Sequence, residues 1–281
     1  MLLKNKNIIL TGAGRGIGRE IAKKLSSEGA NLVLIARTES ELIETLEILN
    51  SKNNSTFYIP LDISNEEKVI KSFGEILKRV KTVDCLINNA GVQPPIGPFN
   101  KINLSEWKQN ININLFGTVN CTYAVMNKMI EGKKGKIINM AGGGSTSPRP
   151  NFSAYSVAKT AIVRFTETVA VELREFNIDV NAVAPGAINT KMLEEVIKAN
   201  ENAGDEYFEA IKRKEKGGNN PVLAAELICF LCSDLSNGIT GKLISAPWDP
   251  WHEKDFQQLL RNDKDIASLR RIDNKTFFKK S

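Results

Sequence analysis

Short apolar runs alternate regularly with segments of helical periodicity, and this alternation is the feature that most constrains the fold. Runs that are apolar on both faces are typical of parallel strands covered by helices on both sides. Because crossovers between parallel strands are right-handed, such units build a doubly wound sheet. The sequence therefore predicts an α/β fold with a mostly parallel sheet. The expected strands cover residues 7–10, 32–35, 56–61, 83–87, 136–140 and 179–183, and the expected helices cover 17–28, 40–50, 66–80, 112–130 and 154–176.

A glycine-rich turn follows the first expected strand and runs into the first expected helix. Gly12, Gly16 and Gly18 allow a tight turn and let the backbone approach a diphosphate closely. The N-terminus of the helix that follows offers unpaired N–H groups and the positive end of its dipole. A glycine-rich string alone is weak evidence, but its place in a βαβ unit predicts a dinucleotide site.

The end of the second expected strand bears on which nicotinamide cofactor is bound. Enzymes that use NAD usually carry an acidic residue there, which bonds the ribose 2′-hydroxyl. Ala36 offers no carboxylate to repel a 2′-phosphate, and Arg37 offers a planar fork that suits one. Arg15 in the glycine-rich turn adds a second cation. We therefore expect NADP(H) rather than NAD, and the alternative is that Arg37 is only a surface charge.

A tyrosine and a lysine four residues apart open the last long helix. Tyr155 and Lys159 share one helix face because residues at i and i+4 are neighbours. A free tyrosine has a pKa of about 10 and is a poor acid or base at neutral pH. A nearby ammonium group, together with a positively charged nicotinamide, is expected to lower that pKa. Combined with the glycine-rich turn, the pair predicts acid–base catalysis.

Composition excludes several other classes of protein. The net charge of +6 comes from 38 basic and 32 acidic residues, which suits either a solvated surface or the attraction of anionic ligands. No basic-aromatic array indicates nucleic acid, and no apolar run of about 18 residues indicates a membrane span. Four cysteines and a start without a signal-peptide pattern indicate a reducing compartment, the cytoplasm. No metal site is expected, since the Cys229/Cys232 pair lacks a second ligand pair.

Several further motifs, taken with these, give the chain a strong resemblance to the short-chain dehydrogenase/reductase family over about residues 5–245. The resemblance implies a single-domain Rossmann fold with about seven parallel strands. It also implies a homodimer or homotetramer formed through the two long helices, at 112–130 and 154–176. The further motifs are Asp62, the segment from Asn88 to Gly91, Asn114 before Leu115-Phe116-Gly117, and Pro185-Gly186.

The resemblance also assigns roles to individual residues. Tyr155 would give a proton to the carbonyl oxygen in reduction or take one in oxidation. Lys159 would bind the nicotinamide ribose and lower the pKa of Tyr155. Asn114 would hold a water that links Lys159 to solvent. The expected cofactor-binding residues are Gly12, Gly14, Arg15, Gly16, Ile17, Gly18, Arg37, Thr38, Asp62, Ile63, Asn89, Ala90, Gly91, Tyr155, Lys159, Pro185, Gly186, Ile188 and Thr190.

One position departs from the family pattern. A serine that bonds the substrate oxygen normally stands thirteen residues before the tyrosine, and here that position is Gly142. Losing one such donor typically lowers the rate by about 10²–10³. Three explanations stay open: Ser145 supplies the hydroxyl, a backbone N–H of Gly143 or Gly144 replaces it, or the activity is weak or altered.

The chain is expected to divide into a catalytic domain at residues 1–246 and an extension at 247–281. Residues 189–220 are helical and highly charged, and they are placed where a lid commonly forms. The extension is an interface or an active-site cover. Its Trp248 and Trp251 either pack an interface or form a wall near the substrate, and a short amphipathic helix follows them.

These observations predict an NADP(H)-dependent oxidoreductase that interconverts an alcohol and a ketone or aldehyde by hydride transfer, mainly as a reductase. Tyr155, Lys159, Asn114 and Ser145 are the expected catalytic residues. The substrate is a small molecule, either a sugar or nucleotide-sugar intermediate or a 3-oxoacyl thioester. The alternative is a cofactor-binding sensor or scaffold with little catalysis, motivated by Gly142.

Overall fold

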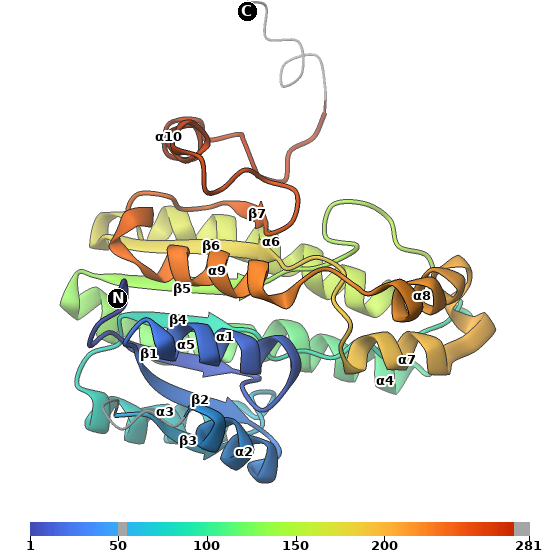
Figure 1. The fold of residues 1–281 in the computed structure, drawn as a ribbon, viewed down its shortest axis with the longest axis horizontal. Coiled ribbons are helices and arrows are strands. Elements are labelled where there is room, and N and C mark those ends of the chain that lie inside the picture. The colour runs from blue at the N-terminus through green and yellow to red at the C-terminus, as the bar shows by residue number, and fades with distance from the viewer. Residues whose placement is uncertain (50–54, 273–281) are drawn as a thin grey trace, which may run out of the picture.

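The computed structural model describes residues 1–49 and 55–272, so Phe277 and Phe278 of the tail lie outside the described residues. Within them, one parallel sheet has the strand order β3-β2-β1-β4-β5-β6-β7, which confirms the predicted doubly wound α/β fold (Figure 1). The strands are β1 (Asn7–Thr11), β2 (Asn31–Ala36), β3 (Phe57–Pro60), β4 (Cys85–Asn88), β5 (Gly135–Met140), β6 (Ile178–Ala184) and β7 (Leu243–Ser245). The α-helices are α1 (Gly16–Ser27), α2 (Glu39–Leu49), α3 (Glu66–Val80), α4 (Leu104–Ile111), α5 (Gly117–Gly132), α6 (Ser153–Glu172), α7 (Lys191–Ala199), α8 (Asp205–Lys216), α9 (Pro221–Cys232) and α10 (Lys254–Asn262).

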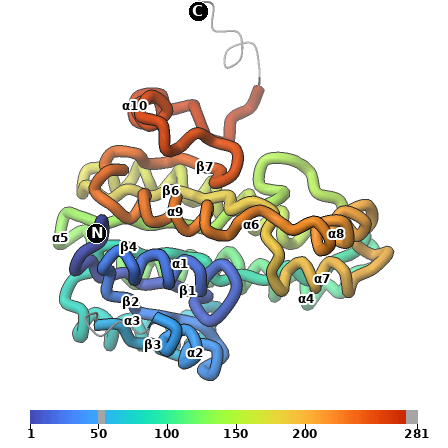
Figure 2. The backbone as a smooth tube through the Cα atoms, viewed as in Figure 1, coloured from blue at the N-terminus to red at the C-terminus, as the bar shows by residue number. Residues whose placement is uncertain are grey.

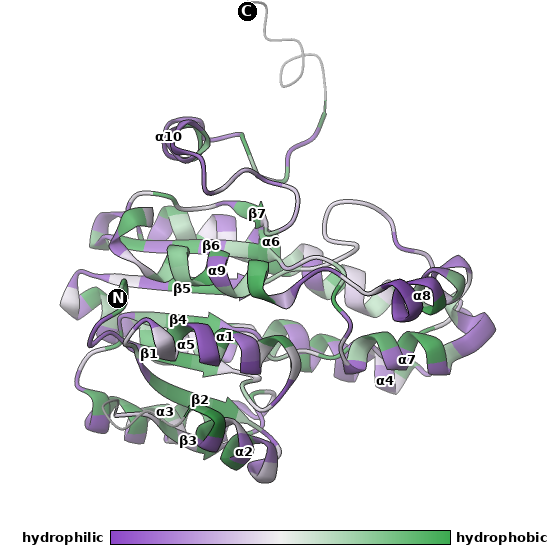
Figure 3. Ribbon diagram, in the orientation of Figure 1, coloured by the Kyte–Doolittle hydropathy of each residue, from purple (hydrophilic) through white to green (hydrophobic). Residues whose placement is uncertain are grey.

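The sheet is buried on both faces, which explains its continuous apolar strands. Ile8 and Leu10 of β1 pack with α1, α2 and α9, whereas Ile9 between them packs with α3, α5 and α6. Successive side chains of a strand point to opposite faces, so each face receives every second residue. Figure 3 shows this distribution: the strands are hydrophobic, and hydrophilic residues gather on the outer sides of the helices.

The helix expected at 112–130 differs from the observed one. A helix, α4, precedes it and is capped by the Asn103 side chain, which accepts hydrogen bonds from the N–H groups of Ser105 and Glu106. Residues Asn112–Phe116 are π-helical, and α5 begins only at Gly117. Periodicity missed this break because one π turn displaces the apolar stripe by a single residue. The helix expected at 154–176 ends at Glu172 and is followed by a 3₁₀ turn.

The two segments outside the regular strand–helix pattern lie apart. The charged segment 189–220 forms α7 and α8, which project beyond the carboxyl ends of the strands (Figure 1). Residues 247–272 lie beside β7 at the edge of the sheet (Figure 2). There Leu243 N donates to the Ala267 carbonyl oxygen, and Leu260 is buried in the main core.

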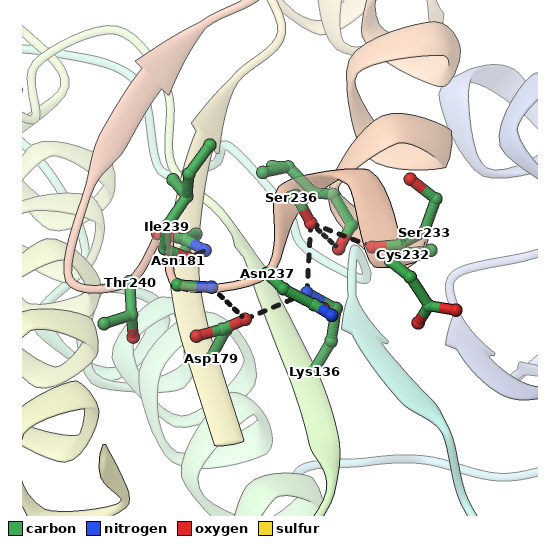
Figure 4. Close-up of polar contacts among 12 residues, drawn as sticks. Lys136, Asp179, Asn181, Cys232, Ser233, Ser236, Asn237, Ile239 and Thr240 are labelled. Carbon is green, nitrogen blue, oxygen red and sulfur yellow. Dashed lines mark hydrogen bonds and ion pairs between the residues drawn. The ribbon is translucent and has the colours of Figure 1, made fainter. Parts of the chain in front are cut away.

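A buried ion pair joins the amino ends of β5 and β6. The Lys136 ammonium donates to Asp179 Oδ2 at 2.9 Å and to Ser236 Oγ at 3.0 Å (Figure 4). The Ser236 hydroxyl in turn donates to the Leu231 and Ser233 carbonyl oxygens at the end of α9. Burial without partners is costly for a charge, so this network fixes how α9 meets the sheet.

Candidate active site

A cavity of about 320 Å³ lies at the carboxyl ends of the central strands, where the strand order reverses between β1 and β4. Crevices at this position bind ligands in open α/β sheets. Most of the residues expected to bind a cofactor line it. The lining residues are Gly12, Gly14, Arg15, Gly16, Ile17, Gly18, Ile35, Ala36, Arg37, Thr38, Glu41, Leu61, Asp62, Ile63, Asn89, Ala90, Gly91, Val92, Ile113, Met140, Ala141, Tyr155, Lys159, Pro185, Thr190, Lys191, Met192 and Glu195.

The glycine-rich turn has room for no side chain at two positions. Gly12 has a φ of +68°, and a Cβ on it would lie 2.8 Å from the Ala90 Cα. A Cβ on Gly18 would lie 1.9 Å from the Gly12 carbonyl oxygen. The side chain of Asn89 holds the turn, because its Nδ2 donates to the carbonyl oxygens of Thr11 and Gly12. The turn is therefore built for close backbone approach.

The N-terminus of α1 suits an anionic group. Arg15 at the N-cap makes no side-chain cap, and the first turn of the helix holds no acidic residue. The N–H groups of Gly16, Ile17 and Gly18 therefore have no capping side chain, and all three residues line the cavity. A diphosphate accepts hydrogen bonds from such groups. The residues present therefore fit the diphosphate of a dinucleotide.

One end of the cavity is bounded by the loop after β2. Arg37 is exposed and makes no hydrogen bond or ion pair with the residues that the structure describes. Arg15 pairs with Glu41 at 2.7 Å. The Asp62 carboxylate accepts hydrogen bonds from the N–H and hydroxyl of Ser64, which orients it at the rim. Among the described residues, Arg37 is thus a cation at this end of the cavity that is not held by an ion pair.

Tyr155 and Lys159 lie together at the other end of the cavity and are both buried. The Lys159 ammonium donates to the Met140 carbonyl oxygen at 2.7 Å and lies 5.5 Å from the centre of the Tyr155 ring. Burial lowers the pKa of Lys159 to about 8. Burial also raises the pKa of Tyr155, with Arg149 lowering it and Glu206 raising it. The loss of water on burial outweighs the lowering by Arg149.

Asn114 lies in the π-helical segment, behind the cavity. Its Oδ1 accepts a hydrogen bond from Val92 N, and its Nδ2 donates to the Val92 carbonyl oxygen and to Asn110. A Cβ on Gly91 would lie 2.6 Å from Asn114 Oδ1 and 3.5 Å from the Lys159 ammonium. The structure therefore brings Asn114 and Lys159 to the same glycine, although Asn114 does not line the cavity.

Gly142 lies directly beside the tyrosine hydroxyl. A Cβ there would be 2.6 Å from Tyr155 Oη, so this is the point from which the family's serine would reach the substrate. Ser145 is buried, and its hydroxyl is bonded to both the N–H and the carbonyl oxygen of Gly142. Neither Ser145 nor Gly186 nor Ile188 lines the cavity, whereas Pro185 and Thr190 do.

Two functional candidates were missed by sequence reasoning. Arg149 stacks on Phe152, with its Cζ 3.8 Å from the ring centre, and forms a two-bond ion pair with Glu206 of α8. Glu195 of α7 lines the cavity, and burial raises the pKa of its carboxyl. No motif marks either residue, since only the fold brings α7 and α8 to the loop after β5.

A cleft for a dinucleotide that ends at a buried tyrosine–lysine pair, on a doubly wound sheet, defines the class of nicotinamide-dependent oxidoreductases. Comparison with known families agrees. The model of the family described as short chain dehydrogenase matches residues 6–201, and the chain belongs to this family.

Similar proteins extend the comparison beyond the family model. The 3-oxoacyl-acyl-carrier-protein reductase FabG of Aquifex aeolicus is 35% identical over 247 residues, covering 86% of this chain and 96% of the relative. A diacetyl reductase of Staphylococcus epidermidis is 34% identical, covering 85% and 96%. Among solved structures, NAD⁺-bound xylitol dehydrogenase is 27% identical, with a TM-score of 0.81, and the match covers 87% of this chain and 98% of that one. The chain is thus an oxidoreductase with a Rossmann-like fold that acts on an alcohol/carbonyl pair.

Proposed function

We propose that the protein is an NADP(H)-dependent reductase that converts a ketone or aldehyde to an alcohol, with Tyr155 as the proton donor. The observation that carries the proposal is the continuous cavity, which runs from Arg37 to the Tyr155–Lys159 pair. A nicotinamide bound in this cleft would supply the hydride. Everything else falls to residues of the chain itself.

The proton path starts at Tyr155. Its O–H bond breaks as the proton passes to the carbonyl oxygen of the substrate, and the phenolate then takes a proton from the direction of Lys159. Lys159, with a pKa of about 8, exchanges protons readily near neutral pH. Asn114 supports the path by fixing the π-helical segment against Val92, beside the same Gly91 that faces the ammonium.

The missing serine is best replaced by the backbone of the glycine loop. The N–H groups of Gly143 and Gly144 donate no hydrogen bond to the described residues, so either could turn to a developing oxyanion, although neither glycine lines the cavity in this structure. Ser145 holds the loop instead, through its two bonds to Gly142. Ser145→Ala should then loosen the loop and lower kcat by less than Tyr155→Phe does. If both changes lowered kcat equally, Ser145 itself would be the hydrogen-bond donor to the substrate oxygen.

NADP(H) is preferred over NAD(H) because Ala36 and Arg37 stand where an acidic residue would otherwise bond the ribose. The similarity to FabG supports a 3-oxoacyl thioester as substrate. A sugar or nucleotide-sugar intermediate is the second candidate. It is favoured by the likeness to xylitol dehydrogenase and to a gluconate 5-dehydrogenase of Burkholderia cenocepacia in complex with NADP and tartrate, which is 26% identical with a TM-score of 0.77 and covers 86% of this chain and 94% of that one.

The first experiment titrates the protein with NADPH and NADH by fluorescence and then adds 3-oxoacyl thioesters, keto-sugars and simple ketones. Tight NADPH binding with NADPH consumption on one panel is the expected result and names the substrate class. Tight binding without consumption on any panel, in wild type and in Tyr155→Phe alike, would instead favour a cofactor-binding sensor or scaffold, the reading that Gly142 motivates.

The exposed apolar side chains of the long helices and the state of the cysteines bear on the assembly and location of the protein. Apolar side chains are exposed along the two long helices, including Tyr123 of α5 and Val157 and Val171 of α6. Such exposure supports a homodimer or homotetramer through these helices, to be measured by light scattering. All four cysteines are free and buried, which supports the reducing cytoplasm. No helix of the described residues is long and apolar enough to cross a membrane.

A further inference from the structure

A guanidinium group lies beside the tyrosine at the place where the family's serine is missing. The Cζ of Arg149 is 5.6 Å from the centre of the Tyr155 ring. A Cβ on Gly143 would lie 3.7 Å from the Nη1 of Arg149, and a Cβ on the preceding Gly142 would lie 2.6 Å from the tyrosine hydroxyl. The glycines therefore leave space that the arginine borders.

The arginine is held by the lid. Its Nε and Nη2 donate to the two carboxylate oxygens of Glu206, at 2.5 Å each, and Glu206 belongs to α8. Two parallel charge-assisted bonds fix the orientation of both groups. The side chains are only 15% and 33% exposed, so water screens the pair less than it would screen a surface ion pair. The segment α7–α8 is thus tied to the catalytic loop by one ion pair.

The charges that face Tyr155 are few. Lys159 lies one turn further along its own helix, Arg149 comes from the loop after β5, and Glu206 comes from α8. From α7 the neighbours in its core cluster are Leu193 and Val196, which are apolar. Burial brings the pKa of Lys159 to about 8, so its ammonium is lost above that pH. A guanidinium keeps its charge at every working pH, so Arg149 supplies the permanent cation.

We propose that Arg149 is a positioning residue for Tyr155: its charge, moderated by the ion pair with Glu206, stabilises the phenolate that proton donation leaves behind. This proposal rests on the proposed function. When the O–H bond of Tyr155 breaks, the proton goes to the carbonyl oxygen and the negative charge stays on Oη. A cation 5.6 Å from the centre of the ring, in a partly buried site, lowers the free energy of that charge. Through Glu206, α8 thereby acts on the chemistry by way of Arg149.

The test exploits the opposite signs of the two partners. Glu206→Gln removes the negative charge, so the pKa of Tyr155 should fall by about one unit. Arg149→Gln removes the cation and leaves Glu206, so the pKa should rise by about the same amount. Arg149→Lys keeps the positive charge but loses the two-bond geometry with Glu206, so the pKa of Tyr155 should stay near its wild-type value. A purely structural clamp would instead make the lysine and glutamine variants alike.

The readout is an ultraviolet difference titration of the phenolate, with each variant compared to the same variant carrying Tyr155→Phe. It needs no turnover, so it works even if the proposed function fails, which the substrate panels would show separately. Glu209→Gln is the matched control, because Glu209 lies on the same helix but pairs with the exposed Lys212. Shifts of equal sign in Glu206→Gln and Arg149→Gln, or no shift in either, would overturn the proposal.

The pH–rate profile gives the second reading. Reduction needs protonated Tyr155, so the rate falls as pH rises through its pKa. The falling limb should lie at higher pH in Arg149→Gln and at lower pH in Glu206→Gln. At neutral pH the kcat of Arg149→Gln should drop about tenfold with KM little changed, because only the proton-transfer step loses stabilisation. A change in KM alone would assign the pair to substrate binding instead.

Discussion

Arg37 extends from the end of β2 without a partner among the described residues, and we expect it to bind the 2′-phosphate. Charge-assisted hydrogen bonds of this kind contribute about 1.5–3 kcal/mol. Arg37→Ala should therefore raise the Kd for NADPH about 10- to 100-fold and leave that for NADH almost unchanged. Fluorescence titration with both cofactors measures the ratio. Lys71→Ala, an exposed change on α3, is the control, and equal losses for both cofactors would remove the 2′-phosphate assignment.

Gly142 carries a prediction that runs against the family pattern. Restoring the usual residue with Gly142→Ser should lower kcat rather than raise it, because the new Cβ would lie 2.6 Å from Tyr155 Oη and displace the hydroxyl. Gly74→Ser on α3, where a Cβ meets nothing within 4 Å, is the matched control. Turnover on the responsive substrate panel measures both. If Gly142→Ser raised kcat instead, the loop would have moved to make room for the new side chain, and the prediction would be wrong.

Lys159 makes stability depend on pH with a definite sign. Burial lowers its pKa to about 8 from the usual 10.5 of a lysine, so between these values the unfolded chain binds more protons than the folded one. Stability therefore rises with pH in that window. Between pH 8 and 10 the free energy of unfolding should rise by about 2 kcal/mol more in wild type than in Lys159→Met. Buried thiols act oppositely above about pH 9, but equally in both proteins.

At the scale of elements, the ion pair at the amino ends of β5 and β6 should matter more than any surface pair. Asp179→Ala leaves the Lys136 ammonium buried without its carboxylate, which should cost about 3–5 kcal/mol in urea unfolding. Glu131→Ala, which breaks the exposed pair with Lys128, should cost under about 1 kcal/mol. The double variant Lys136→Met with Asp179→Leu should recover much of the loss. If Asp179→Ala and Glu131→Ala lowered the free energy of unfolding equally, water would reach the Lys136 ammonium and the prediction would be wrong.

The elements also show how far sequence reasoning reaches. Strands β1 to β6 were predicted because a sheet covered on both faces needs continuous apolar runs such as Leu32–Ile35, whereas the short β7 was not among the expected strands. The glycine-rich turn was placed by its position after β1. The π-helical break at Asn112–Phe116 escaped because it shifts the apolar stripe without changing composition. The ion pair of Arg149 with Glu206 was not predicted, because it depends on where α8 lies in the folded protein. Local patterns predict elements, whereas contacts between distant elements need the fold.

At the scale of the whole molecule, residues 247–272 of the extension pack against the main core. Trp251 packs on Phe230 of α9 and donates to the Ala246 carbonyl oxygen, while Trp248 is 73% exposed. The buried Lys242 ammonium donates to the carbonyl oxygens of Asp263 and Ile266. Residues 247–272 therefore close the open edge of β7, which would otherwise offer unpaired backbone groups to other chains.

Deleting residues 247–281 should consequently destabilise the protein and promote association. It removes the carbonyl oxygens that accept from the Lys242 ammonium, and it exposes the β7 edge. We expect a clearly lower Tm and higher-order species in light scattering. The Kd for NADPH should stay within about twofold, since the cofactor cavity draws no lining residue from residues 247–272, the described part of the extension. Trp248→Ala, which removes an exposed ring, is the control and should leave the Tm, the association state and the Kd for NADPH unchanged. A truncated protein of normal stability with weakened substrate affinity would instead make the extension a wall of the active site.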